Sequence, residues 1–287
     1  MLSQIHILRF HLSLILVLGL SSLVCASNAS ISFPFETING LTIIQAEVDG
    51  QTGSYLLDTG SDGIFLDGAV INSDHSIVTL GGTSQISTKT LQKLTVGTFY
   101  QENIEAQIIS LEPIEDHLGI DLKGIIGGHF FLPKVLYIDF AKSRITLSDR
   151  LQKSERKQFE NKVNIELVHD IPIATVKIEN KTYQFALDSG SSIHFIDTET
   201  LHNLNMVIQT NDTATMKCLA NTNKEIQKVQ LESFYIGNAC FSNQTYLHKD
   251  FEDVNATLGI TLNGILSLSQ LSKDVVVVDY AHRKMYF

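Results

Sequence analysis

The chain has 287 residues, of which 44% are hydrophobic and 18% are charged, and its formal net charge is -10 at pH 7. This length suits two domains of ordinary size, and the balance of residue types is typical of a compact folded protein and not of a disordered one. The negative charge argues against the basic surface with which nucleic-acid-binding proteins hold phosphates, so no nucleic-acid partner is expected.

The first 26 residues have the features of a signal peptide. An apolar run follows Arg9 and ends at Val24-Cys25-Ala26, where cleavage after Ala26 would suit a signal peptidase. The run is short for a retained membrane anchor, which is the alternative. Val24 is too large for the residue that usually precedes a lipidated cysteine. We therefore expect a chain that loses residues 1–26 and is exported, periplasmic or secreted, with no stable membrane insertion after processing.

The remaining chain contains an internal repeat. SYLLDTGSDGIFLD at 54–67 matches QFALDSGSSIHFID at 184–197, at an offset of 130 residues. Further along, GIDLKGIIG at 119–127 matches GITLNGILS at 259–267, and the offset is now 140. The second copy therefore carries about ten extra residues, which we place near 201–211. A repeat of this length indicates two units of similar structure.

The repeat also sets the expected domain boundaries. We predict a signal peptide at 1–26, an N-terminal domain at 31–148, and a C-terminal domain at 163–287. Between the two domains, DRLQKSERKQFENK is rich in charge and is predicted to form a solvated linker or short helix over 149–162.

Both copies have the patterns of β-strands. In the first copy, alternating apolar residues at 44–48 are followed by Asp49-Gly50 and an apolar run into Asp58, which predicts strand, turn and strand. TLGGTSQIST at 79–88 predicts a hairpin with a glycine tip. The runs VLYIDF and VVVVDY are typical of buried strands. Helix is expected only in short pieces, namely after Gly127, after Gly264 and over 198–205.

Each predicted strand that precedes the repeated motif ends at an aspartate. The motif is Asp-[Thr/Ser]-Gly-Ser, and its residues are Asp58, Thr59, Gly60 and Ser61 in the first copy and Asp188, Ser189, Gly190 and Ser191 in the second. The glycines let the backbone turn sharply and present amide groups to the carboxylate. The hydroxyls of Thr59 and Ser189 can bond to the opposite loop, and those of Ser61 and Ser191 can bond the outer oxygen of their own aspartate.

The paired motif predicts acid–base chemistry. If the two copies pack about a pseudo-two-fold axis, Asp58 and Asp188 face each other and share one proton, because two close carboxylates cannot both be ionised cheaply. The ionised carboxylate can then accept a proton from a water molecule, and the protonated one can donate to a substrate carbonyl oxygen. Together these steps hydrolyse an amide without a covalent intermediate.

These motifs resemble those of the retropepsin-like aspartic proteases, most closely of bacterial exported members in which two retropepsin-like units are fused. The resemblance covers residue 31 to the end. It implies an all-β fold with two acid-protease β-barrel domains related by pseudo-two-fold symmetry, with the active site between them. It also implies an aspartic endopeptidase that acts as a monomer on an extended peptide or protein substrate, with no cofactor.

Further residues carry the resemblance. Asp62 resembles the acidic residue that follows the motif in retroviral enzymes, and GIIG at 124–127 resembles the segment that passes beneath the catalytic loop. Gly81 and Gly82 match the tip of a flap over the substrate. Two departures affect the second copy: Ser267 replaces an expected glycine, and the flap region at 215–226 has no glycine, so that only the first flap is expected to work.

Three other functions are alternatives to the peptidase. A non-catalytic peptide-binding protein would explain Ser267 and the unusual second flap, but not the two intact aspartates. A structural surface protein would have no use for the paired motif. A glycosidase also uses two carboxylates, but it needs no symmetric Asp-[Thr/Ser]-Gly sequence.

The cysteines and histidines indicate no metal site, because CxxC and HExxH spacings are both missing. His194 is expected to be a wall residue and not a catalyst. Without the leader, Cys218 and Cys240 remain, and we expect them to form a disulfide in the exported protein, although their spacing alone leaves both states open.

Overall fold

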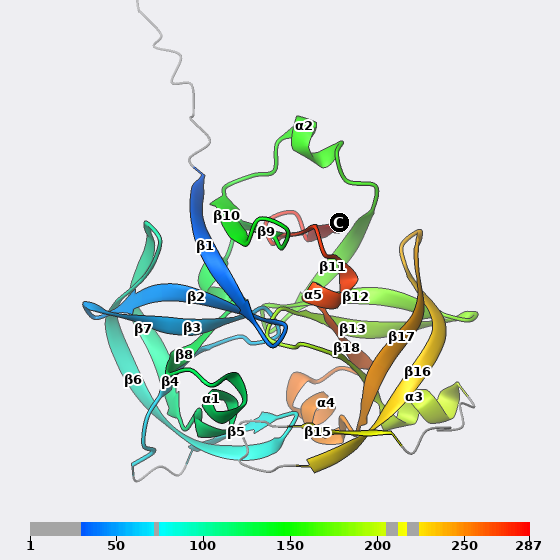
Figure 1. Cartoon of the computed structure of the whole chain (residues 1–287), viewed down its shortest axis with the longest axis horizontal. Coiled ribbons are helices and arrows are strands. Elements are labelled where there is room, and N and C mark those ends of the chain that lie inside the picture. The colour runs from blue at the N-terminus through cyan, green and yellow to red at the C-terminus, as the bar shows by residue number, and fades with distance from the viewer. Residues whose placement is uncertain (1–29, 72–74, 205–211, 217–223) are drawn as a thin grey trace, which may run out of the picture.

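The structure is a computed structural model that describes residues 30–71, 75–204, 212–216 and 224–287. The described residues are mostly β-strand, which confirms the expected all-β class (Figure 1). The strands of the first half (31–148) are β1 (Ile31–Ile38), β2 (Leu41–Val48), β3 (Gln51–Asp58), β4 (Ile64–Asp67), β5 (His75–Thr79), β6 (Gly82–Val96), β7 (Phe99–Ile109), β8 (Leu122–Gly127), β9 (Val135–Asp139) and β10 (Arg144–Ser148). The strands of the second half (163–287, with Lys162) are β11 (Lys162–Val168), β12 (Ile171–Ile178), β13 (Lys181–Asp188), β14 (His194–Asp197), β15 (Thr213–Met216), β16 (Lys224–Ile236), β17 (Ala239–Lys249), β18 (Gly264–Ser267), β19 (Val275–Asp279) and β20 (Lys284–Tyr286).

Strand pairing closes a ring in each half. In the first half β2 pairs with β3, β3 with β8, β8 with β4, β4 with β7, β7 with β6, and β6 again with β2. In the second half β12, β13, β18, β14, β17 and β16 pair in the same cyclic order. Strands β2 and β12 have the same alternation of buried and exposed residues, because one face of each lies on the core.

Six further strands form one antiparallel sheet that joins the halves, in the order β1, β10, β9, β19, β20, β11. Its central pair is β9 and β19, in which Tyr137 lies opposite Val277, its equivalent at the offset of 140. Figure 1 shows this sheet between and above the two rings. The largest cluster of buried apolar side chains contains residues from both halves, so the joining sheet and the inner faces of the rings share one core.

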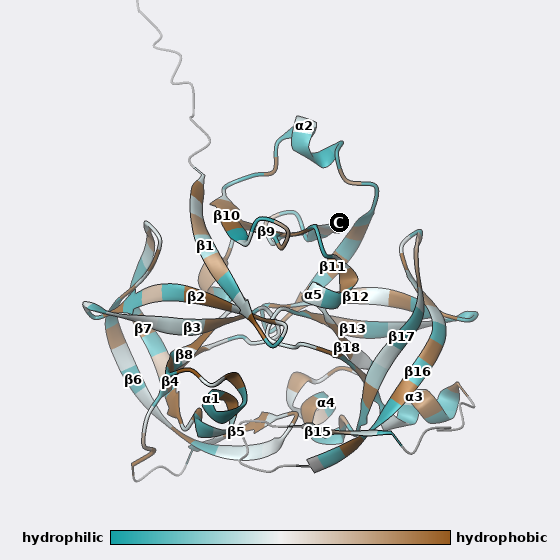
Figure 2. Ribbon diagram, in the orientation of Figure 1, coloured by the Kyte–Doolittle hydropathy of each residue, from teal (hydrophilic) through white to brown (hydrophobic). Residues whose placement is uncertain are grey.

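The described residues form the helices α1 (Glu112–Leu118), α2 (Lys153–Arg156), α3 (Thr198–Asn203), α4 (Glu252–Leu258) and α5 (Leu268–Leu271), and the 3-10 helix η1 (Gly128–Phe131). The three expected helical pieces correspond to η1, α5 and α3. The short helix expected in the linker is α2, which is strongly hydrophilic in Figure 2. Of the segment 201–211, where we expect the extra residues of the second copy, the first residues lie at the end of α3 and positions 205–211 lie outside the described residues.

Helices α1 and α4 were not expected from the sequence. They are held by a pair of repeated aspartates, since Asp67 Oδ1 accepts the amide of Leu111 at 2.9 Å and Asp197 Oδ1 accepts the amide of Phe251 at 3.0 Å. Each aspartate lies at the end of a strand, and each amide belongs to the residue before the helix. The repeated aspartates thus fix helix starts more than forty residues away in the chain.

Within the part of the chain that the structure describes, no helix is both long and apolar enough to span a membrane. Cys240 on β17 is exposed. The cysteine expected to pair with it, Cys218, lies outside the described residues, so the disulfide stays a prediction.

Candidate active site

The two motif aspartates lie at the ends of equivalent strands. Asp58 ends β3, and Asp188 ends β13. Each strand runs parallel to a short strand from later in its own half, so that Asp58 pairs with Gly127 on β8 and Asp188 pairs with Ser267 on β18. The apolar residues before each aspartate are buried on the core side, which forces the chain to emerge from the core at the carboxylate.

Four hydrogen bonds cross between the two motif loops. Thr59 Oγ1 donates to the Leu187 carbonyl at 2.8 Å and accepts the Ser189 amide at 3.0 Å. In the reciprocal pair, Ser189 Oγ donates to the Leu57 carbonyl at 2.8 Å and accepts the Thr59 amide at 3.0 Å. Thr59 and Ser189 are fully or almost fully buried, so water cannot replace these bonds. The hydroxyl bonds to the opposite loop expected from the sequence are present.

The motif glycines bring the two carboxyl groups together. A Cβ atom on Gly60 would lie 2.7 Å from Cγ of Asp188, and one on Gly190 would lie 2.5 Å from Cγ of Asp58. Both distances are too short for any side chain. Each glycine also donates its amide to the aspartate of its own loop, at 2.8 Å to Asp58 Oδ1 and 2.6 Å to Asp188 Oδ1. Only glycine therefore permits the two loops to approach this closely.

Burial shifts both carboxyl groups toward the protonated form. Burial raises the pKa of Asp58 well above its usual value, and the charge of Asp188 raises that pKa further. Burial also raises the pKa of Asp188, against the lowering effect of its hydrogen bonds with Asp58 and the neighbouring amides. The two carboxyl groups are hydrogen-bonded to each other, and carboxyl groups in such close contact do not titrate independently of each other.

The serines that end the two motifs do not behave as expected from the sequence. The Ser61 hydroxyl accepts the Gly63 amide at 3.4 Å, and the Ser191 hydroxyl donates to the Ile193 carbonyl at 2.6 Å. Among the described residues, neither hydroxyl bonds its own aspartate. The expectation fails because the backbone two residues downstream turns back toward each serine and satisfies its hydroxyl locally. It is instead the Ser191 amide that helps to lower the pKa of Asp188.

The end of β8 passes beneath the first motif loop, and the end of β18 passes beneath the second. In the first half, this close passage requires a glycine. The Gly127 amide donates to the Gly63 carbonyl at 2.9 Å, and a Cβ atom on Gly127 would lie 2.4 Å from that oxygen and 2.6 Å from the Ser61 carbonyl oxygen. In the second half the same place holds Ser267, which is completely buried. Its amide donates to Nδ1 of His194 at 3.0 Å and not to a backbone carbonyl.

This difference predicts opposite outcomes for one substitution at equivalent positions. Gly127→Ala is expected to destabilise the fold by about 2 kcal/mol or more, because backbone atoms on two sides leave no room for the methyl group. Ser267→Ala, the matched control, keeps a Cβ atom that the second half already accommodates and loses one hydroxyl bond, so we expect a cost of about 1 kcal/mol. Chemical denaturation of both variants measures the difference, and equal losses would contradict this packing.

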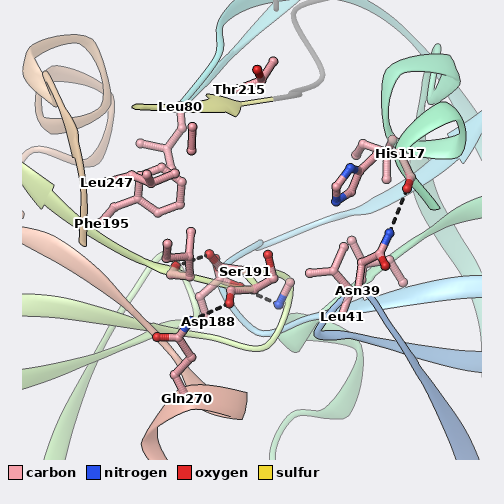
Figure 3. A pocket seen from close by; sticks show the side chains of 16 residues that line it. Asn39, Leu41, Leu80, His117, Asp188, Ser191, Phe195, Thr215, Leu247 and Gln270 are labelled. Carbon is pink, nitrogen blue, oxygen red and sulfur yellow. Dashed lines mark hydrogen bonds between the residues drawn. The ribbon is translucent and has the colours of Figure 1, made fainter. Parts of the chain in front are cut away.

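A pocket of about 440 Å³ opens beside Asp188, and Figure 3 shows the side chains that line it. Gly190 and Ser191 line it next to the aspartate. Apolar side chains form most of its walls, with Leu41, Leu56, Leu80 and Ile114 from the first half and Phe195 and Leu247 from the second. At one edge Asn39 donates its side-chain amide to the His117 carbonyl at 2.8 Å. The pocket is thus a largely apolar space with one of the two motif carboxyl groups, that of Asp188, in its wall.

The remaining predicted site residues differ in how they relate to Asp58 and Asp188. Asp62 is exposed, and its negative charge contributes to the raised pKa of Asp58. Gly81 and Gly82 lie at the turn between β5 and β6, as the hairpin prediction requires, but it is the preceding residue, Leu80, that enters the pocket. Of the second flap region, positions 217–223 lie outside the described residues.

Leu80, Phe195 and Leu247 were not singled out in the sequence. Leu80 comes from the first half and packs on an apolar cluster of the second half that contains Phe195 and Leu247. Isolated apolar residues carry no local sign of the cavity that they line. One signal was available: Phe195 lies seven residues after Asp188, as Phe65 does after Asp58, within the repeated motif.

Residues 174–269 match the model of a family described as aspartyl proteases. No curated protein sequence matches the chain. The matched segment contains Asp188 and its loop and extends past Ser267, so it covers the half of the site that departs most from the expected pattern. The match supports a hydrolase of the aspartic protease type. Among the described residues, no group of three or more histidine, cysteine or acidic side chains is arranged to hold a metal ion.

Proposed function

We propose that this protein is an exported aspartic endopeptidase in which Asp58 and Asp188 together activate a water molecule for attack on a peptide bond. The observation that carries the proposal is the hydrogen-bonded pair of carboxyl groups, one buried (Asp188) and one half-buried (Asp58), each with a raised pKa. One carboxylate acts as general base toward the water, and the protonated partner donates to the substrate carbonyl oxygen. The Gly60 and Gly190 amides hold each carboxyl group in place during this exchange.

The proposed architecture is two fused retropepsin-like domains, 31–148 and 163–287, related by a pseudo-two-fold axis that passes between the two aspartates. The two rings of strands with the same pairing order and the central pair of β9 and β19 support it. Because one chain supplies both loops, we propose that the protein works as a monomer. We further propose that residues 1–26 are a signal peptide and that the mature protein is periplasmic or secreted.

The proposed substrate is an extended peptide or protein segment that lies between the first hairpin and the carboxyl pair. The apolar walls of the pocket favour a large apolar side chain next to the scissile bond, because burying it there removes apolar surface from water. Leu80, Phe195 and Leu247 would contact that side chain directly (Figure 3).

Digestion of a broad peptide library by the mature protein tests this function. We expect cleavage with an enrichment of large apolar residues next to the cut, and no cleavage by Asp58→Asn under the same conditions. A wild-type protein that binds peptides but leaves all of them intact would favour the non-catalytic peptide-binding alternative. Cleavage that persists in Asp58→Asn would point to a contaminating peptidase.

A further inference from the structure

The two aspartates are supported from beneath in different ways. Beneath Asp58, the Gly127 amide bonds to a backbone carbonyl, and Ile64 of the same half is an apolar, buried residue. Beneath Asp188, the residue equivalent to Gly127 is Ser267, and the residue equivalent to Ile64 is His194. Both second-half residues are completely buried and contact each other through the bond from the Ser267 amide to Nδ1 of His194. The two departures from the repeat thus compensate for each other.

The compensation follows from geometry. A Cβ atom at the first-half position would collide with two backbone oxygens, so Ser267 cannot adopt the backbone contact that Gly127 makes. Its amide would then be buried without an acceptor, which is costly. The imidazole of His194 supplies that acceptor. The carbonyl of Ile193, at the position equivalent to Gly63, instead accepts the Ser191 hydroxyl at 2.6 Å.

Ser267 also connects this arrangement to the other half. Its hydroxyl lies 3.0 Å from the Ser269 hydroxyl, which donates to the Gly40 carbonyl at 3.1 Å. Because the single hydroxyl proton of Ser269 is used on Gly40, Ser267 must donate to Ser269. Gly40 belongs to the turn that also carries Asn39, a residue at the edge of the pocket. The chain of bonds therefore runs from His194, beneath Asp188, to the first half.

We propose that His194 is a positioning residue for Asp188: its unprotonated Nδ1 holds the Ser267 amide, and with it β18, against the end of β13, so that hydrolysis requires a neutral His194. The proposal rests on the proposed peptidase function. His194 does not touch the substrate and is not a catalytic residue. It acts through Ser267, which is the strand partner of Asp188.

Protonation of His194 would disrupt this support. An imidazolium carries a proton on Nδ1, which would face the Ser267 N–H and leave two donors opposed. The aromatic side chains that face the ring are Tyr246 from β17 and Phe234 from β16, at 5.0 Å and 6.0 Å between ring centroids, and neither carries a charge at acidic or neutral pH. Burial lowers the pKa of His194 to about 4. The neutral form therefore prevails above that pH, and the support is lost as the pH falls through it.

The test compares substitutions that keep or remove the acceptor. His194→Asn places an oxygen near the position of Nδ1 and cannot be protonated there, whereas His194→Leu has no acceptor. At pH 6 we expect the asparagine variant to keep kcat within about threefold of wild type and the leucine variant to lose about tenfold or more, with little change in KM. Below pH 4, the asparagine variant should keep activity to lower pH than wild type, with an acid limb less steep by one proton.

Two further variants sharpen the test. His194→Ile combined with Ser267→Gly copies Ile64 and Gly127, so it should recover the kcat that His194→Leu loses and show the same extended acid limb as His194→Asn. His248→Asn is the matched control. The pKa of His248 is also lowered, but this ring is only half-buried, and its Nε2 bonds Thr198 at 2.8 Å, away from Asp58 and Asp188. Its acid limb should be that of the wild type.

Three results would overturn the proposal: an acid limb in His194→Asn equal to that of wild type, wild-type kcat in His194→Leu, or a folded double variant that is no better than His194→Leu. If none of the variants folds, nitrogen NMR of the ring in the wild-type chain decides, because Nδ1 must be unprotonated and Nε2 protonated at pH 6. This measurement does not depend on activity. A wild-type protein inactive at every pH would instead contradict the peptidase function itself.

Discussion

Replacing either Asp58 or Asp188 by asparagine is expected to lower kcat for peptide cleavage by about a thousandfold or more. Asparagine keeps the size of the side chain and can still accept the glycine amide that now bonds each carboxyl group. It cannot hold or release the shared proton. In Asp58→Asn the base and the acid are no longer a pair, so both proton transfers fail together.

The double replacement is the sharper part of this prediction. If the two carboxyl groups work as one unit, Asp58→Asn combined with Asp188→Asn should cost little more than either single change, because the unit is already lost. Independent roles would instead multiply the two losses. Peptide-cleavage kinetics on wild type and the three variants, with circular dichroism as the control for folding, separate these cases. A folded single variant that keeps more than about a tenth of wild-type turnover would contradict the shared proton.

The raised pKa values also predict the pH dependence. Hydrolysis needs one proton on the pair, and the raised pKa values keep that proton bound to higher pH than an isolated aspartate would. A bell-shaped profile is expected, with an alkaline limb above the usual pKa of aspartate. The folded state binds more protons than the unfolded state in this range, so the pair lowers the free energy of unfolding as the pH rises through the raised pKa values. Asp58→Asn removes one of the two carboxyl groups and should melt at a higher temperature than wild type at pH 7.

Thr59→Val is the substitution with the second largest expected effect. Valine has the shape of threonine but no hydroxyl, so the Leu187 carbonyl and the Ser189 amide would both lose their partner at a site that water cannot reach. Each buried group left without a hydrogen bond costs about 1–3 kcal/mol. We expect a loss of about 2–4 kcal/mol in the free energy of unfolding. A larger separation of the two loops should also lower kcat by at least about tenfold.

Thr59→Ser is the matched control, because it keeps the hydroxyl and reproduces what Ser189 does in the other half. Denaturant unfolding and cleavage kinetics on the two variants separate the effect of losing the hydroxyl, in Thr59→Val, from the effect of losing the methyl group, in Thr59→Ser. Thr59→Ser should retain most of the stability and turnover. If Thr59→Val is as stable and as active as Thr59→Ser, the crossed bonds do not hold the loops together.

The features that depend on short motifs and on their repetition could be predicted from the amino-acid sequence. An apolar strand that ends in Asp-[Thr/Ser]-Gly-Ser places a carboxyl group at the edge of the core, and two such strands in one repeat predict that Asp58 and Asp188 lie together. The hydroxyls of Thr59 and Ser189 could be assigned to the opposite loop for the same reason. The β-hairpin at 79–88 and the glycines that admit a close approach were also readable, because they depend on local backbone geometry.

Features that join segments far apart in the chain could not be predicted from the sequence and are seen only in the fold. Helices α1 and α4 start where Asp67 and Asp197 accept backbone amides more than forty residues away in the chain, and no local sequence pattern predicts such a bond. The Ser61 and Ser191 hydroxyls turned to the backbone of their own loops, because which of several nearby acceptors a hydroxyl takes depends on distances that only the folded chain sets. From the sequence, Ser267 is a departure from the expected glycine and His194 is a wall residue. Their hydrogen bond joins residues that are 73 positions apart in the chain, so no local pattern predicts it. Side chains far apart in the sequence can compensate for each other only when the fold brings them into contact. Local sequence patterns do not show which distant residues will be in contact.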